Sequence, residues 1–243
     1  MRRIARWLTA VFYKPFLVIW LSKERSYSYQ GIRLKIHPQV FHPGFFFSTK
    51  ILLRYLNTLP LQDKKFLELG AGSGLISISA AKAGAMVTAT DINQLAIEYL
   101  RHNIGLNGVD SKLIVSDLFS KIPEQVFDIV AINPPYYFET PAGIAQYAWH
   151  CGKNGEYFHG LFKQLSNYID QKTVILMILC EGSNRAEIHS IGRKYGFRFE
   201  CVQTVRNMIE RNFIYQIHIL TGHDGSSTLK QDEKDTIIQS PEQ

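Results

Sequence analysis

The sequence predicts an α/β protein in which a doubly wound, mostly parallel sheet is covered by helices on both faces. Two observations support this prediction: apolar, strand-like runs alternate with segments of helical length, and the segments between them are ten to fifteen residues long. The last two strand-like runs break this rhythm, because no stretch of helical length separates them. They therefore predict a C-terminal hairpin whose final strand is antiparallel.

The expected elements follow one another with short connections. Strands are expected at residues 65–70, 86–91, 112–117, 127–133 and 173–180. Helices are expected at residues 75–84, 93–107, 156–169 and 184–195. The hairpin strands are expected near residues 197–205 and 213–220. Gly84 closes the first helix, and Asn93 is a candidate cap for the second.

Length and charge define the expected domains. The chain has 243 residues, 46% of them hydrophobic, which is enough for one domain with a sizeable core. The net charge is +6, but eight basic residues and one acid lie within the first 35 residues, so the remainder carries −1. We expect residues 1–37 to form a basic helical extension, residues 38–221 the main domain, and residues 222–243 a disordered polar tail.

The N-terminal range contains an apolar run that Arg6, Lys14 and Pro15 interrupt. We therefore expect no transmembrane helix and no stable membrane insertion. A helix docked on the domain, an amphipathic segment that touches a membrane or RNA, and a targeting peptide remain open for this range.

The cysteines and histidines show no metal-binding or disulfide pattern. Cys151, Cys180 and Cys201 are odd in number and lack C-x-x-C spacing, which predicts reduced thiols in a cytoplasmic protein. The eight histidines include no H-E-x-x-H pair, so no metal is expected.

The first strand of the main domain ends in a glycine-rich stretch, ELGAGSG, at residues 68–74. In doubly wound sheets, ligands bind beyond the carboxyl ends of the strands. Gly70, Gly72 and Gly74 are spaced G-x-G-x-G, whereas a dinucleotide fingerprint reads G-x-G-x-x-G. Glu68 precedes them, and a carboxylate there repels a pyrophosphate but attracts a ligand ammonium. These residues favour an adenosyl amino acid over NAD, although a tight turn alone explains one or two of the glycines.

Two further acids end the next strands. Asp91 lies about 20 residues beyond the glycines, the usual place for an acid that accepts hydrogen bonds from ribose hydroxyls. Its alternative role is a helix cap, but Asn93 can fill that role. Asp117 ends the third strand and is expected to accept from an adenine amine, unless it is a surface turn residue.

Four stretches together resemble the class I S-adenosylmethionine-dependent methyltransferases with an N-P-P-Y motif, which have a Rossmann-like fold: FLELGAGSGLISI, ATDIN, SDLF and NPPYY. The following stretch, ETPAGIAQYAWHCGKNGEYFHGLF, is similar to the HemK-like branch, the protein-glutamine methyltransferases of release factors. Upstream, VFHPGFFFST at residues 40–49 looks like the segment of that family that packs over the cofactor. The sequence departs from the branch at His150 and Cys151, where a glycine pair is usual, and at Phe45–Phe47, where acids are usual.

The resemblance covers roughly residues 38–220 and implies several properties. The cofactor is S-adenosyl-L-methionine, bound by Glu68, Gly70, Gly72, Asp91 and their neighbours Gly74 and Asp117. Residues 38–221 form the methyltransferase catalytic domain. The implied partner is a protein substrate with a glutamine acceptor, such as a release factor.

The N-P-P-Y motif ends the fourth strand with a double proline that cannot continue a ladder. A planar amide or aromatic amino nitrogen is a poor nucleophile, and two acceptors on its N–H bonds orient it and stabilise the developing charge. We expect the Asn133 side-chain oxygen and the Pro134 carbonyl to be these acceptors, and Tyr136 to lie flat against the substrate. Pro135 and Tyr137 are expected to contact the substrate. The alternative is a strand-ending turn without a catalytic role.

The sequence therefore predicts an S-adenosylmethionine-dependent N-methyltransferase that acts on a glutamine side chain of a protein. The main alternative is an RNA methyltransferase that acts on an exocyclic amine of adenine or guanine, with the basic N-terminus on phosphates. The near-neutral remainder of the chain argues mildly against RNA. The intact motifs disfavour a non-catalytic binding module, and the glycine spacing disfavours a nicotinamide oxidoreductase. An adaptor subunit stays open.

Overall fold

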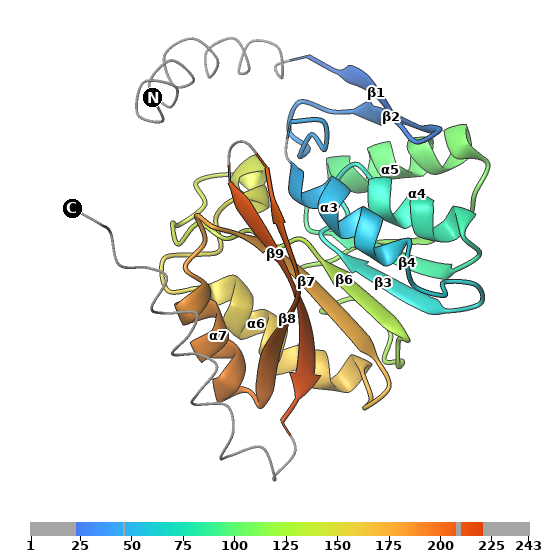
Figure 1. Cartoon of the computed structure of the whole chain (residues 1–243). Helices are drawn as coiled ribbons and strands as arrows, with labels where there is room; N and C mark the ends of the chain where they lie inside the picture. The colour runs from blue at the N-terminus through green and yellow to red at the C-terminus, as the bar shows by residue number, and fades with distance from the viewer. Residues whose placement is uncertain (1–22, 46, 208–209, 221–243) are drawn as a thin grey trace.

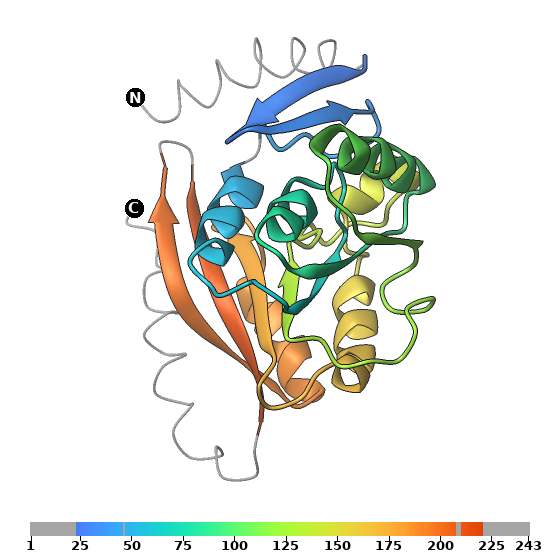
Figure 2. The ribbon, with the colours of Figure 1, turned by 90° about the vertical axis from the view of Figure 1, so that its right-hand side faces the viewer.

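The computed structural model describes residues 23–45, 47–207 and 210–220, which form a seven-stranded sheet with helices on both faces (Figures 1 and 2). The strands are β3 (Lys65–Leu69), β4 (Met86–Asp91), β5 (Lys112–Val115), β6 (Ile129–Ile132), β7 (Val174–Cys180), β8 (Phe197–Arg206) and β9 (Arg211–Ile219). Their order is β5-β4-β3-β6-β7-β9-β8, and the neighbouring strands from β5 to β7 are parallel. The predicted fold class is confirmed.

The predicted C-terminal hairpin is also confirmed, and its last strand is inserted into the sheet. β9 is antiparallel to β7 and to β8, and it lies between them. β8, the next-to-last strand along the chain, therefore forms one edge of the sheet, and β5 forms the other.

The helices cover both faces because the strand side chains alternate between two hydrophobic clusters. In β6, Ile129 and Ala131 face one cluster, and Val130 and Ile132 face the other. The first cluster includes side chains of α3 (Phe47–Leu56), α4 (Leu75–Lys82) and α5 (Gln94–Asn107). The second includes side chains of α6 (Glu156–Leu165) and α7 (Arg185–Lys194). Burial on both faces explains why the strands are apolar without alternation.

The expected helical extension at residues 1–37 differs from the structure where the structure describes it. β1 (Arg25–Tyr29) and β2 (Ile32–Ile36) form an antiparallel hairpin that lies over α5 in Figure 1. The physical reason is a two-residue turn at Gln30 and Gly31, both with positive φ, between residues that alternate in burial. Residues 1–22 and the predicted tail at 222–243 lie outside the described residues.

Two asparagines of α5 attach this hairpin to the domain. Asn103 Oδ1 accepts from Lys35 N at 2.7 Å, and Asn103 Nδ2 donates to Lys35 O at 2.9 Å. Asn107 makes the same pair of contacts with the backbone of Arg33, at 3.0 and 2.7 Å. The spacing of the two asparagines along α5 matches the spacing of Lys35 and Arg33 along β2, because four residues of helix and two residues of strand both advance by about 6 Å. The hairpin is therefore held through its backbone as well as by Ile32, Leu34 and Ile36, whose side chains are buried in the core.

Two local features also differ from expectation. Helix α3 was not anticipated, and it buries Ile51, Leu52 and Leu53 against the sheet. The third strand ends at Val115 and not at residue 117, because Ser116 Oγ donates to Leu118 O at 2.9 Å and starts a turn. Within the described ranges, no helix is both long and apolar enough to cross a membrane.

Candidate active site

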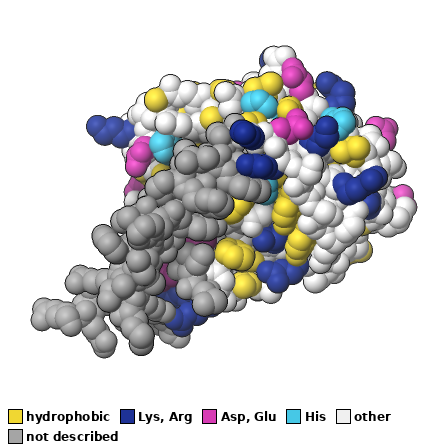
Figure 3. Space-filling view, turned by 90° about the horizontal axis from the view of Figure 1, so that it is seen from above, with side chains coloured by type: hydrophobic (Ala, Val, Ile, Leu, Met, Phe, Trp, Pro, Cys, Tyr) yellow, Lys and Arg dark blue, Asp and Glu magenta, His cyan; other side chains and the backbone are white. Residues whose placement is uncertain are grey.

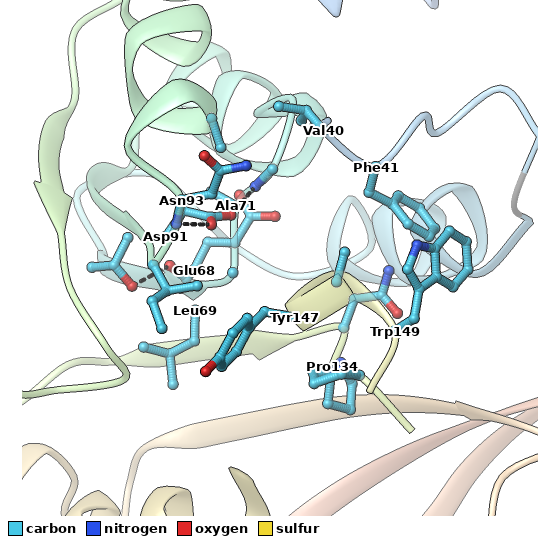
Figure 4. Close-up of a pocket in the computed structure, with 18 of the residues that line it drawn as sticks. Val40, Phe41, Glu68, Leu69, Ala71, Asp91, Asn93, Pro134, Tyr147 and Trp149 are labelled. Carbon is cyan, nitrogen blue, oxygen red and sulfur yellow. Dashed lines mark hydrogen bonds between the residues drawn. The ribbon is translucent and has the colours of Figure 1, made fainter. Parts of the chain in front are cut away.

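A pocket lies at the carboxyl ends of the central strands, where the chain reverses its direction across the sheet. From β3 the chain continues to β4 and β5, and it then returns to β6 on the other side of β3. In Figure 4, Glu68, Asp91 and Asn93 lie on one side of the pocket, and Phe41, Trp149 and Pro134 lie on the other. This is the crevice in which doubly wound sheets bind their ligands.

The glycine-rich loop forms the floor between β3 and α4. The backbone N–H groups of Gly70 and Ala71 donate to Thr90 O at 2.9 and 2.8 Å, which ties the loop to β4. Gly70, Gly72 and Gly74 all have positive φ, so the turn itself explains the three glycines, and not only one or two.

The three glycines differ in what surrounds them. A Cβ on Gly70 would meet no atom within 4 Å, and one on Gly72 would meet its nearest atom at 3.9 Å, so both face open space in the pocket. A Cβ on Gly74 would overlap Leu100 of α5, and Gly74 does not line the pocket. The structure thus places Gly70 and Gly72 at the pocket and Gly74 against α5.

Asp91 lies at the end of β4, partly buried, with its carboxylate held by backbone groups. Its Oδ2 accepts from Gly72 N at 2.9 Å and its Oδ1 from Asn93 N at 2.8 Å. Burial raises the pKa of Asp91, while the backbone N–H groups of Asn93, Gly72 and Ile92 lower it. A carboxylate has about four acceptor sites, so capacity remains for a ligand hydroxyl.

Asn93 takes the capping role that had been the alternative for Asp91. Its Oδ1 accepts from Leu95 N at 3.0 Å, and it precedes α5 as the N-cap residue. Its Nδ2 donates to Gln39 O at 3.3 Å, which fixes the segment that carries Val40 and Phe41 against the pocket.

Glu68 is almost fully buried beneath the glycine loop, with 5% of its surface exposed. Its Oε2 accepts a hydrogen bond from Ser77 Oγ in α4. Burial raises the pKa of Glu68 to about 8, and the Ser77 contact only partly opposes this. A cation bound beside Glu68 would favour its ionised form.

Asp117 is exposed and lines the pocket in the turn after β5, the strand next to β4. Tyr157 of α6 also lines the pocket, and burial, followed by the charges of Asp91 and Asp117, raises the pKa of this phenol. The Tyr157 hydroxyl therefore stays protonated and remains a donor near the two acids.

On the far wall, the N-P-P-Y motif follows the end of β6, and Asn133, Pro134, Pro135 and Tyr136 all line the pocket. The Asn133 side-chain nitrogen donates to the hydroxyls of Ser48 and Thr49 at 3.3 and 3.2 Å. Among the described residues, no donor reaches Asn133 Oδ1 or the Pro134 carbonyl. The two expected acceptors are thus both at the pocket and unengaged.

The two tyrosines of the motif occupy different positions. Burial, followed by the nearby Cys180 thiol, raises the pKa of Tyr136, so its hydroxyl stays protonated. Tyr137 does not line the pocket; its ring is exposed and lies edge-on to the Tyr136 ring, with centroids 5.0 Å apart. Tyr137 N donates to Trp149 O at 3.0 Å, which fastens the next segment over the pocket.

That segment supplies pocket residues for which no role was predicted. It contains the 3-10 helix η2 (Ile144–Ala148), and Ile144, Tyr147 and Trp149 all line the pocket. The Trp149 ring lies 5.0 Å from that of Phe41, so segments more than 100 residues apart close one side together. The aromatic residues after N-P-P-Y could have indicated a pocket wall, whereas nothing in the sequence indicated that the hydroxyls of Ser48 and Thr49 contact Asn133.

The lining has a distinct charge. Its charged residues among those the structure describes are Glu68, Asp91 and Asp117, all acidic. Such a pocket repels phosphates and attracts cations. Together with the open glycines, it defines an α/β enzyme of the class that binds a cationic nucleoside cofactor at the switch point.

Comparisons with known proteins identify the family. The model of the methyltransferase small domain matches residues 31–148. A protein of Methanocaldococcus jannaschii, named provisionally as a protein N5-glutamine methyltransferase, is 33% identical over 177 residues, which are 70% of this chain and 87% of that protein. The chain belongs to the S-adenosylmethionine-dependent methyltransferases with this domain, and it is an N-methyltransferase.

Other relatives differ in the substrate that their names give. Ribosomal RNA small subunit methyltransferase C of Actinobacillus pleuropneumoniae is 33% identical over 116 residues, 46% of this chain and 35% of that protein. The Mtq2–Trm112 complex of E. cuniculi, responsible for methylation of the eRF1 termination factor, has a similar fold (TM-score 0.58, 21% identity, 74% of this chain, 99% of that chain). The T. thermophilus 16S rRNA guanine methyltransferase has a TM-score of 0.58 (19% identity, 79% and 50%).

S-adenosylmethionine is the cofactor, and the residues present fit it. Its sulfonium and ammonium groups are cationic, which suits an acidic lining and a buried Glu68. Asp91 has acceptor capacity for ribose hydroxyls, and the open faces of Gly70 and Gly72 allow close approach of the ligand to the backbone. When bound, the cofactor supplies an electrophilic methyl group.

Proposed function

We propose that this methyltransferase acts on the side-chain amide of a glutamine in a protein substrate, of which a release factor is the model case. Asn133 Oδ1 and the Pro134 carbonyl accept hydrogen bonds from the two N–H bonds of the acceptor amide, and Tyr136 packs against its plane. The acceptor nitrogen attacks the methyl carbon, the sulfur keeps the electron pair of the broken bond, and the methylated nitrogen gives its extra proton to water. The two acceptors stabilise the positive charge that develops on that nitrogen.

The observation that most favours a protein acceptor is the absence of lysine, arginine and histidine among the described residues of the pocket. Four exposed hydrophobic side chains lie on the segments that border it: Phe47, Tyr137, Ile144 and Tyr147. In Figure 3, which views the end of the molecule where the parallel strands finish, basic side chains in the described part are scattered among hydrophobic and acidic ones. RNA-binding surfaces instead gather basic residues along the backbone path.

The relatives support the same proposal. The Methanocaldococcus jannaschii protein, of which the chain covers 87%, is named for glutamine methylation, and the E. cuniculi complex methylates a termination factor. We also propose that the protein acts in the cytoplasm, since Cys151, Cys180 and Cys201 are all free thiols.

An RNA acceptor is the second candidate. It is favoured by the similarity to ribosomal RNA small subunit methyltransferase C and by the eight basic residues within the first 35. The acceptor chemistry is the same, because an exocyclic amine of guanine or adenine is also a planar nitrogen.

The test uses S-adenosylmethionine with a tritiated methyl group and a cell lysate. If the proposal holds, the label survives RNase and is lost with protease, and peptide mass spectrometry places the methyl group on a glutamine. Label that is lost with RNase and survives protease would replace the proposal with the second candidate.

Two controls make the labelling specific. Asn133→Ala is expected to label neither fraction, although it still binds the cofactor. A recombinant release factor and its variant with the acceptor glutamine changed to alanine test the model substrate, and equal labelling of the two would exclude that glutamine.

A further inference from the structure

The side-chain amide of Asn133 is held by two hydroxyl groups of α3. Its nitrogen lies 3.3 Å from Ser48 Oγ and 3.2 Å from Thr49 Oγ1, and both hydroxyl oxygens are placed to accept. An amide nitrogen has two N–H bonds, so these two contacts use its full donor capacity. The oxygen is then the only amide atom left for the pocket.

The helix that carries the hydroxyls is firmly placed. Ser48 and Thr49 lie in the first turn of α3 and are buried, with 4% and 8% of their surface exposed. The same helix buries Leu52, Leu53 and Leu56 almost completely in the core beside the sheet. The packing of α3 therefore fixes the backbone from which both hydroxyls project.

The orientation of this amide matters for the reaction. The N–H of the substrate nitrogen donates a hydrogen bond, so it needs the oxygen of Asn133 as its partner. If the amide were turned over, its NH₂ group would face that N–H, and two donors cannot form a hydrogen bond. If the amide nitrogen loses its two partners, the side chain can rotate to find others, and the fraction of molecules with the oxygen toward the acceptor falls. Small errors in such positions reduce the rate strongly.

We propose that Ser48 and Thr49 are positioning residues that hold Asn133 Oδ1 toward the acceptor nitrogen. They act through Asn133; Thr49 also lines the pocket, whereas Ser48 does not. The proposal applies to a protein or an RNA acceptor, so it is independent of the choice made under the proposed function.

A measurement without substrate tests the geometry. The protein is labelled with ¹⁵N-asparagine, and the Asn133 side-chain resonances are identified by their absence in Asn133→Asp. Hydrogen exchange of these two protons is expected to be at least about tenfold faster in the Ser48→Ala, Thr49→Val double variant, because both hydrogen bonds are lost. Thr58→Val is the matched control: Thr58 lies beyond the other end of α3 and its hydroxyl donates to Tyr55 O.

A kinetic measurement tests the function with whichever lysate fraction the wild-type enzyme labels. Ser48→Ala and Thr49→Val are each expected to lower kcat about three- to tenfold, in line with the loss of one hydrogen bond. The dissociation constant of S-adenosylmethionine should stay within about twofold, since Glu68, Gly72 and Asp91 are unchanged. Thr49→Ser keeps a hydroxyl and should retain most of the activity, and Thr58→Val should match the wild type.

Three results would overturn the proposal. The first is a wild-type Asn133 amide that exchanges as fast as an exposed asparagine. The second is a double variant with wild-type kcat, and the third is a loss of cofactor affinity that parallels the loss of kcat. If the wild type labels neither fraction, the exchange measurement decides by itself.

Discussion

At the scale of the residue, two carboxylates at neighbouring strand ends share one pocket but are held differently. Burial raises the pKa of Asp91, and the backbone N–H groups that donate to its carboxylate oppose this rise. Glu68 receives only the Ser77 hydroxyl in a fully buried setting, and burial raises its pKa to about 8. Asp91 is therefore suited to fixed hydrogen bonding, whereas the charge of Glu68 depends on what lies beside it.

Glu68 predicts a pH-dependent cofactor affinity. Below pH 8 the empty pocket holds Glu68 largely protonated, so an arriving ammonium must displace that proton, and affinity should rise as the pH approaches 8. Calorimetry between pH 6 and 8, in two buffers of different ionisation enthalpy, measures the released protons. The ligand amine titrates in the same range, so the relevant quantity is the difference between wild type and Glu68→Gln, and equal profiles would exclude Glu68.

The same pKa predicts a stability effect with the opposite sign. A carboxyl whose folded pKa is raised stabilises the protein fully below its unfolded pKa of 4.5, and this contribution is lost as the pH rises to 8. Glu68→Gln removes that pH dependence, so at pH 7 the cofactor-free variant should melt roughly 2–6 °C higher than the wild type. A lower melting temperature at pH 7 would contradict this account.

Asn133 predicts a separation of binding from turnover. Asn133→Ala removes one of the two acceptors for the reacting nitrogen and leaves Glu68 and Asp91 unchanged. Turnover should be abolished, and the affinity for S-adenosylmethionine should stay within a few-fold. Calorimetry and the tritium assay measure the two quantities, and a loss of cofactor binding would refute the assigned role.

At the scale of the element, α5 connects the β1–β2 hairpin to the cofactor loop. Asn103 donates to Lys35 O and also to Ser73 O, at 2.9 and 3.0 Å, and it is fully buried. Asn107 makes its hairpin contacts near the surface. Helix α5 thus holds the hairpin through Asn103 and Asn107, and of these two residues only Asn103 also contacts the glycine loop.

This difference predicts unequal costs for the two asparagines. Asn103→Ala leaves buried backbone groups without partners and should lower the free energy of unfolding by about 2–3 kcal/mol. Asn107→Ala exposes its partners to water and should cost less than about 1 kcal/mol. Urea unfolding of both variants measures this, and equal losses would contradict the assigned role of Asn103.

At the scale of the whole molecule, ligand binding at the switch point should stabilise the complete sheet. The pocket is lined from β3, β4, α4, the N-P-P-Y segment that follows β6 and the segment that carries Trp149, so a bound ligand joins elements from both halves of the domain. Strand ends that are otherwise linked only through the sheet then share a common contact.

This arrangement predicts selective stabilisation. S-adenosylhomocysteine at about 100 times its dissociation constant should add about 2.7 kcal/mol to the free energy of unfolding. NAD should add nothing measurable, because the described lining has only acidic charges to face its pyrophosphate. Urea unfolding with each ligand measures the difference, and stabilisation by NAD would contradict the electrostatic argument.

The sequence by itself determined the fold class, the cofactor and the presence of the N-P-P-Y motif. These features are local: apolar runs mark the strands, and Gly70, Gly72, Asp91 and Asn133 each stand at a strand end, so a parallel sheet must bring them to one edge. Each of these features could be predicted from residues that are close together in the chain.

The tertiary structure alone decided which residues support this set. Ser48 reaches Asn133 across 85 positions, Trp149 meets Phe41 across more than 100, and Asn103 holds a hairpin that composition indicated as helix. No periodicity records such pairs, because each contact depends on how α3, α5 and the segment after N-P-P-Y pack on the sheet. The spacing of residues specified the chemistry, and the packing between distant segments specified its geometry.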